Sequence, residues 1–110
     1  MRKPRTNAER WTRILAWLKK EFPPNYPVTV RSIKMKDQGG TELVRKKFLI
    51  TVRCDTCWQV RFDSLLHEWA HALTWEGAET FIDDHSAEWG IAYARVYREF
   101  YRWKWGTAVE

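Results

Sequence analysis

Residues 63–74, Asp-Ser-Leu-Leu-His-Glu-Trp-Ala-His-Ala-Leu-Thr, predict a helix with apolar residues along it. Asp63 or Ser64 can cap its start by accepting a hydrogen bond from a free backbone N–H. Gly77 can end it, because glycine readily takes the left-handed conformation that closes helices. The decisive feature of this helix is a pair of histidines four residues apart, with a glutamate directly after the first.

His67, Glu68 and His71 form the motif HExxH. Residues four apart on a helix differ by about 40° and about 6 Å in rise, so both imidazoles reach one metal ion. Glu68 points away from the histidines and is better placed to hold a water molecule than to ligate. We therefore predict a zinc site in which zinc lowers the pKa of its water to about 7 and Glu68 is the catalytic base. This chemistry is typical of peptide-bond hydrolysis.

A catalytic zinc needs a third protein ligand, and two candidates follow the helix. His85 lies fourteen residues past His71, where the chain has reversed and a last helix begins. Glu88 lies one helical turn further on, and a set of two histidines and one glutamate also holds catalytic zinc. The position six residues past His71 is Gly77, which excludes the metzincin pattern. We favour His85 and keep Glu88 as its rival.

Residues around the third ligand have supporting roles in this prediction. Asp83 or Asp84 can cap the last helix, or orient an imidazole by accepting its other N–H. Hydrolysis also needs a hydrogen-bond donor for the oxyanion that forms on the substrate. Tyr93 is our choice and Arg95 the alternative, although an aromatic residue at this spacing also suits the core.

The rest of the chain predicts one α+β domain over residues 1–110, with residues 1–5 as a loose basic arm. Thr6 and Glu9 form a capping box for a first helix, which Pro23 and Pro24 end. Three strands follow over residues 28–36, 48–53 and 58–62, and turns at 37–40 and 54–57 favour an antiparallel meander. The HExxH helix and a C-terminal helix complete a minimal zincin-like order.

Residues 65–97 resemble the SprT-like and related small zincin metallopeptidases, including forms common in phage genomes. The matching stretches are Leu66-His67-Glu68-Trp69-Ala70-His71-Ala72-Leu73 and Asp84-His85-Ser86-Ala87-Glu88-Trp89-Gly90, with Tyr93 behind them. The resemblance implies zinc ligation by His85, although Ser86 stands where the families usually have glycine. In size and layout the chain also resembles the minigluzincins, which would make Glu88 the ligand. Spartan-type relatives imply DNA-crosslinked proteins as substrates.

The composition of the chain limits which partners and which cellular compartment we expect. The net charge of +5 is compatible with nucleic acid as a partner beside a protein or peptide substrate. No apolar run follows the basic N-terminus, and no stretch reaches the ~18 apolar residues of a membrane span. We therefore expect a cytoplasmic protein without a membrane partner, in the host cytoplasm if it is phage-encoded. Cys54 and Cys57 lie between two predicted strands and most simply form a turn.

Two other functions fit the same residues. In the first, zinc only staples the fold of a non-catalytic module that binds nucleic acid or a protein partner. In the second, the same metal chemistry cleaves another amide, such as a peptidoglycan crosslink. Activity of the wild type, and its loss on changing Glu68, separates the binding module from the hydrolases.

Overall fold

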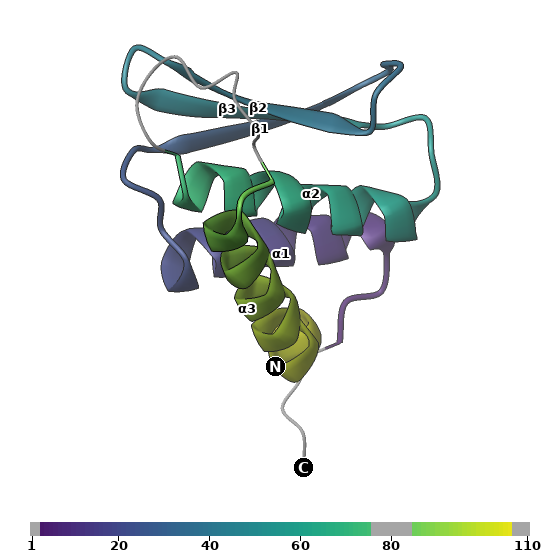
Figure 1. The fold of residues 1–110 in the computed structure, drawn as a ribbon. Coiled ribbons are helices and arrows are strands. Elements are labelled where there is room, and N and C mark those ends of the chain that lie inside the picture. Colours follow the sequence, from purple (N-terminus) through teal and green to yellow (C-terminus); the bar gives the residue numbers. More distant parts are fainter. Residues whose placement is uncertain (1–2, 76–84, 107–110) are drawn as a thin grey trace.

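The computed structural model describes residues 3–75 and 85–106 and shows an α+β architecture (Figure 1). In chain order the elements are α1 (Asn7–Glu21), β1 (Val28–Ile33), β2 (Gly39–Val44), β3 (Lys47–Arg53), α2 (Trp58–Leu73), α3 (Ala87–Trp103) and the short 3-10 helix η1 (Lys104–Gly106). The sheet forms one layer, and all three α-helices lie on the same side of it (Figure 1). None of the helices in the described residues combines the length and the apolar character needed to cross a bilayer.

The first helix begins and ends as its sequence predicts. The Thr6 hydroxyl accepts a hydrogen bond from the backbone N–H of Glu9 at 3.1 Å, which confirms one half of the capping box. The Glu9 carboxylate accepts from the backbone N–H of Arg5 at 3.0 Å, one residue earlier than the box requires. The helix stops at Glu21, ahead of the Pro23–Pro24 pair, because proline cannot continue the hydrogen-bond ladder.

The sheet is mixed, so the predicted antiparallel meander is wrong. The strand order is β1-β3-β2, with β1 parallel to β3 and β2 antiparallel to it. Gly39 and Gly40, which suggested a turn, instead begin β2. The hairpin turn lies at Arg45 and Lys46, whose φ angles of 50° and 61° are left-handed. Such a two-residue turn matches the twist of its strands, but it usually contains glycine or asparagine, which made this one hard to predict.

The strand predicted over Trp58–Phe62 is also wrong, since these residues form the first turns of α2. Trp58 and Phe62 are four residues apart, so on a helix they share one face, and both pack on Trp11 of α1 at 6.2 and 6.0 Å between ring centroids. The N-cap of α2 is Cys57. The predicted caps Asp63 and Ser64 lie inside the helix, so that prediction is wrong. Gly77, its predicted end, lies outside the described residues.

Because α2 starts earlier than predicted, the two cysteines lie at its N-terminal end. Cys57 is the N-cap of α2 and is exposed, while Cys54 is half-buried just after β3. Residues 54–56 form a bend, in keeping with the predicted turn, but the segment joins a strand to a helix and not two strands. Both thiols are free of a disulfide.

The core is aromatic and centres on α2, which packs directly on β2 and β3. Trp69 of α2 is fully buried, and its Nε1 donates a hydrogen bond of 2.8 Å to the backbone oxygen of Phe22 at the end of α1. Truncating a buried tryptophan typically costs about 3–5 kcal/mol, so this residue anchors α1 to α2. Trp69 thereby fixes one face of α2 in the core. His67 and His71 lie outside that buried face and are half-buried.

Candidate metal centre

The start of α3 brings the third histidine to α2. Ser86 is the N-cap of α3, and its hydroxyl accepts from the backbone N–H of Trp89 at 3.2 Å. The cap predicted at Asp83 or Asp84 lies outside the described residues. Because α3 packs against α2, His85 lies directly before a helix that is held beside His67 and His71. Ser86, the departure from the zincin pattern, thus has a local structural role.

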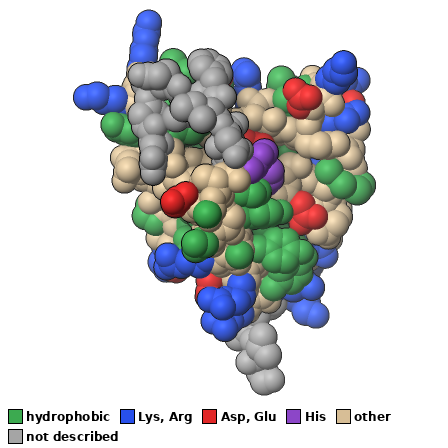
Figure 2. Space-filling model, in the orientation of Figure 1, with side chains coloured by type: hydrophobic (Ala, Val, Ile, Leu, Met, Phe, Trp, Pro, Cys, Tyr) green, Lys and Arg blue, Asp and Glu red, His purple; other side chains and the backbone are tan. Residues whose placement is uncertain are grey.

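The side chains of His67, His71 and His85 converge. Nε2 of His67 lies 3.2 Å from Nε2 of His71 and 3.3 Å from Nε2 of His85. Each residue offers one ligand atom, and all three atoms lie within 4.8 Å of one another. His67 and His71 are half-buried, and His85 is exposed. Figure 2 shows histidine side chains at the surface, near the middle of the face drawn, so a metal ion can reach them from solvent.

These distances fit a zinc ion. Tetrahedral zinc with bonds of about 2.0–2.1 Å to imidazole nitrogen places its ligand atoms about 3.3–3.4 Å apart. The two separations from Nε2 of His67 are 3.2 and 3.3 Å, close to that geometry. Three imidazole nitrogens also form a legitimate catalytic zinc set, which leaves the fourth position for water or substrate. The donor set thus fits zinc in chemistry, and both separations from Nε2 of His67 match a tetrahedral ion.

The surroundings favour the neutral, ligating form of His67. Burial lowers the pKa of His67 below its ordinary value of 6.5, and charge on His85 lowers it further. A neutral imidazole carries the lone pair that a metal requires, whereas a protonated one carries none. At neutral pH, His67 is therefore ready to bind a cation.

Glu68 lies next to the histidines but is held by the sheet. It is only 7% exposed, and its Oε1 accepts a hydrogen bond of 2.7 Å from the hydroxyl of Thr41 on β2. Its Oε2 lies 3.9 Å from Nε2 of His67, which is too long for a direct hydrogen bond. A carboxylate at this distance can act on the site through a water molecule. The role of Thr41 could not be predicted from the sequence, because nothing in the local pattern links β2 to α2.

Trp89 forms the aromatic wall of the centre. Its ring lies 4.9 Å from that of His67, 5.3 Å from that of His71 and 4.6 Å from that of His85, between centroids. Its Nε1 also donates to the backbone oxygen of His67 at 3.4 Å. Trp89 therefore orients all three candidate ligands and bridges α3 to α2. In the sequence, Trp89 belongs to the zincin-like stretch 84–90, and no role in the site was predicted for it.

The other predicted site residues lie at different distances from the centre. Glu88 is exposed and is not among the residues that can share a metal ion with His67 and His71. Tyr93 is half-buried, with its ring 5.7 Å from that of His67. Burial raises the pKa of Tyr93, as does the charge of Asp63, so its hydroxyl stays protonated and can donate. The geometry favours His85 over Glu88 and keeps Tyr93 beside the centre.

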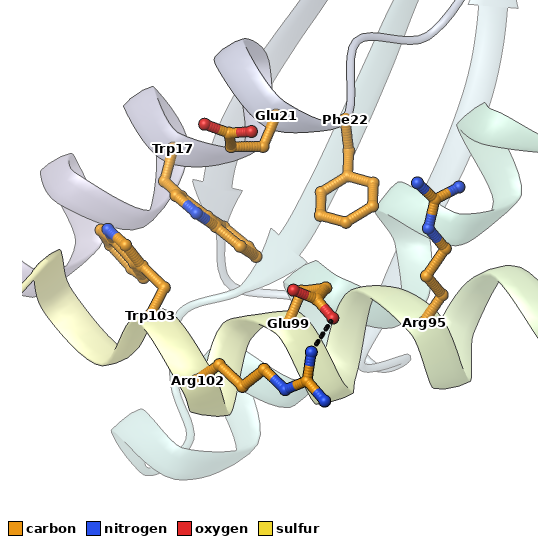
Figure 3. A pocket seen from close by; sticks show the side chains of 7 residues that line it. All are labelled: Trp17, Glu21, Phe22, Arg95, Glu99, Arg102 and Trp103. Atoms are coloured by element: carbon orange, nitrogen blue, oxygen red, sulfur yellow. Dashed lines mark hydrogen bonds and ion pairs between the residues drawn. The ribbon is translucent and has the colours of Figure 1, made fainter. Parts of the chain in front are cut away.

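Arg95, the alternative oxyanion donor, lies away from the histidines. Its guanidinium carbon is 5.4 Å from the centroid of the Phe22 ring. It lines a separate open hollow of about 570 Å³ between α1 and α3, shown in Figure 3. The remaining residues of that hollow are Trp17, Glu21, Phe22, Glu99, Arg102 and Trp103. The contacts of Arg95 therefore lie in this hollow, which shares no lining residue with the histidine cluster.

Comparisons with known proteins do not assign the chain to a family. No protein-family model, no curated protein and no solved structure matches the chain. The resemblance of residues 65–97 to the SprT-like zincins thus has no support beyond its motifs.

Proposed function

We propose that the protein is a zinc-dependent hydrolase of peptide bonds, with His67, His71 and His85 as zinc ligands and Glu68 as the general base. The convergence of three imidazole Nε2 atoms beside a buried carboxylate carries this proposal. Histidine clusters alone also occur in structural and storage sites. The carboxylate, set back 3.9 Å from a candidate ligand atom, is what favours hydrolysis.

Each of these residues has a separate task in the reaction. A bound zinc ion would lower the pKa of water and polarise the substrate carbonyl. Glu68 removes the proton from the attacking water and then transfers it to the departing amine nitrogen. Tyr93, whose ring lies beside that of His67, donates a hydrogen bond from its hydroxyl to the oxygen that gains charge as the carbonyl is attacked. Trp89 excludes bulk water from one side of the ligands, which strengthens these interactions.

The sheet supports an extended peptide as substrate. β2 is one of the two edge strands, and among the described residues only β3 pairs with it. Thr41 on this strand contacts Glu68, so the open edge of β2 runs beside the base. An extended chain can add to such an edge through backbone hydrogen bonds, which places a peptide bond near the metal centre without requiring a particular side chain.

The test is zinc-loaded wild type against Glu68→Gln on unfolded protein and on mixed peptides. Glutamine nearly matches glutamate in shape but cannot take a proton, so we expect zinc binding and melting temperature to change little and cleavage to fall by about a hundredfold or more. His71→Ala, which removes a ligand, should lose both zinc and activity. A zinc-loaded wild type that cleaves no substrate would instead favour the zinc-stapled binding module.

A further inference from the structure

The contacts of Glu68 across the β2–α2 interface extend the site beyond its motif. The carboxylate is almost fully buried, and a buried charge is tolerated only when hydrogen bonds replace its lost hydration. The Thr41 hydroxyl supplies one of them, at 2.7 Å from Oε1. The same hydroxyl lies 3.0 Å from the backbone oxygen of Glu68. With a single proton to donate, the threonine bonds more strongly to the charged oxygen, which is also the closer one.

The hydrogen bond from Thr41 gives the two oxygens of the Glu68 carboxylate different surroundings. Oε1 points to the strand, while Oε2 is the oxygen 3.9 Å from Nε2 of His67. Rotation about the last side-chain bond of a glutamate is nearly free, so an untethered carboxylate would spend its time in many orientations. The hydroxyl of Thr41 removes that freedom and leaves Oε2 aimed at the histidines.

Gly39 makes this approach of strand and helix physically allowed. A Cβ at position 39 would lie 2.9 Å from the backbone oxygen of Thr51, 3.2 Å from Cγ of Glu68 and 3.3 Å from its Oε2. The first of these contacts is shorter than real Cβ atoms accept, and it involves backbone that cannot move aside cheaply. The backbone of β3 thus requires glycine at position 39, and any side chain there would also press on the Glu68 carboxylate.

The register of the sheet places both residues on the same face. Thr41 pairs with Ile50 and Gly39 with Val52, two buried residues of β3. Because strand residues alternate between faces, Gly39 and Thr41 both point to α2 and Gly40 points away. A slip of one residue would put Gly40 in the place of Thr41 and remove the hydroxyl.

We infer that Thr41 is a positioning residue for the proposed base Glu68, with Gly39 providing the space for its carboxylate. The inference rests on the proposed hydrolytic function and deepens it. The strand that borders the substrate path also sets the orientation of the base, so β2 links substrate binding to chemistry. Thr41 touches neither the metal nor the reacting atoms and acts only through Glu68.

The kinetic test compares Thr41→Val, Thr41→Ser and the matched control Thr29→Val in zinc-loaded protein. Valine keeps the shape of threonine without its hydroxyl, whereas serine keeps the hydroxyl. We expect Thr41→Val to lower kcat about tenfold or more with little change in KM or zinc content, and serine to restore most of the rate. Thr29 is an exposed strand residue of β1 and should tolerate valine. A Thr41→Val enzyme with wild-type kcat would overturn the inference and leave the proposed function standing.

A second test needs neither zinc nor activity. In metal-free protein, Thr41→Val should lower the melting temperature by about 4 °C or more, because it removes a hydrogen-bond donor from a buried carboxylate. In a Glu68→Ala background the same change should have less than half of that effect, since the partner is gone. Equal shifts in the two backgrounds would show that the hydroxyl does not hold Glu68, and would overturn the inference. A wild type without hydrolytic activity, in contrast, overturns the proposed function and with it any role for Thr41 in the reaction.

Discussion

Nε2 of His67 and Nε2 of His85 lie 3.3 Å apart, although 18 positions separate the two residues in the chain. Their proximity depends on the packing of α3 against α2 and on Trp89, which contacts both rings. A metal ion held by all three histidines would therefore stabilise this helix packing, because it binds only the folded arrangement.

The choice of third ligand is tested by two single substitutions. His85→Ala should weaken zinc binding by at least about a hundredfold, because it removes one of three donors. Glu88→Ala should leave zinc binding within about twofold of wild type, since Glu88 is exposed and outside the histidine cluster. Competition with a chelating dye measures both dissociation constants. Loss of zinc in the Glu88 variant alone would make the site a two-histidine, one-glutamate centre.

Trp89 should control metal affinity without being a ligand. Trp89→Leu removes the ring that packs on all three histidines, so we expect the zinc dissociation constant to rise about tenfold. Trp11→Leu is the matched control, because Trp11 packs on the first turns of α2, away from the histidines. It should lower the melting temperature and leave zinc affinity unchanged. The same loss of affinity in both variants would point to general destabilisation.

Acid should destabilise the metal-free protein partly through His67. The folded protein lowers the pKa of His67 below 6.5, so the unfolded chain takes up a proton there more readily. This contribution to stability is fully present above about pH 6.5 and is lost as the pH falls through that value. Melting temperatures at about pH 7.5 and about pH 5.5 should differ more for wild type than for His67→Gln. Identical differences would exclude His67 as a source of the acid sensitivity.

Substitutions in the turn between β2 and β3 should stabilise the protein. Arg45 and Lys46 both have left-handed φ angles, which cost residues with a Cβ roughly 1 kcal/mol each. Replacing the pair by Asn-Gly should raise the free energy of unfolding by about 1 kcal/mol, and the melting temperature by about 4 °C. A Gln-Gln pair removes the two charges but keeps the strain, and serves as the control. If it stabilises equally, charge repulsion and not backbone strain is the cause.

The edge of β2 predicts a dependence on substrate length. Peptides of about six residues that can lie along the strand should be cleaved with a kcat/KM at least about tenfold above that of a dipeptide with the same scissile bond. Proline placed on either side of that bond removes N–H groups and should cancel the gain. Equal rates for short, long and proline-interrupted peptides would exclude strand addition.

The predictable parts of this molecule are those set by local chemistry. Thr6 and the proline pair define α1 because capping and chain termination act within a few residues. The HExxH spacing likewise predicts that His67 and His71 share a face. Trp58–Phe62 alternates like a strand, but contacts with Trp11 favour the helix, and no window of sequence contains that partner. The Thr41–Glu68 contact bridges 27 positions and depends on a strand order that local patterns do not specify.

The outer edge of β2, which has no strand partner among the described residues, also has consequences for solubility. An edge that can accept a peptide can accept the same edge of another copy of the protein, and such pairing starts aggregation. Glu42 is the only charged residue of β2, and it is exposed. Two copies that paired through this strand would bring their Glu42 side chains toward each other. Repulsion between these two carboxylates would oppose self-association through β2.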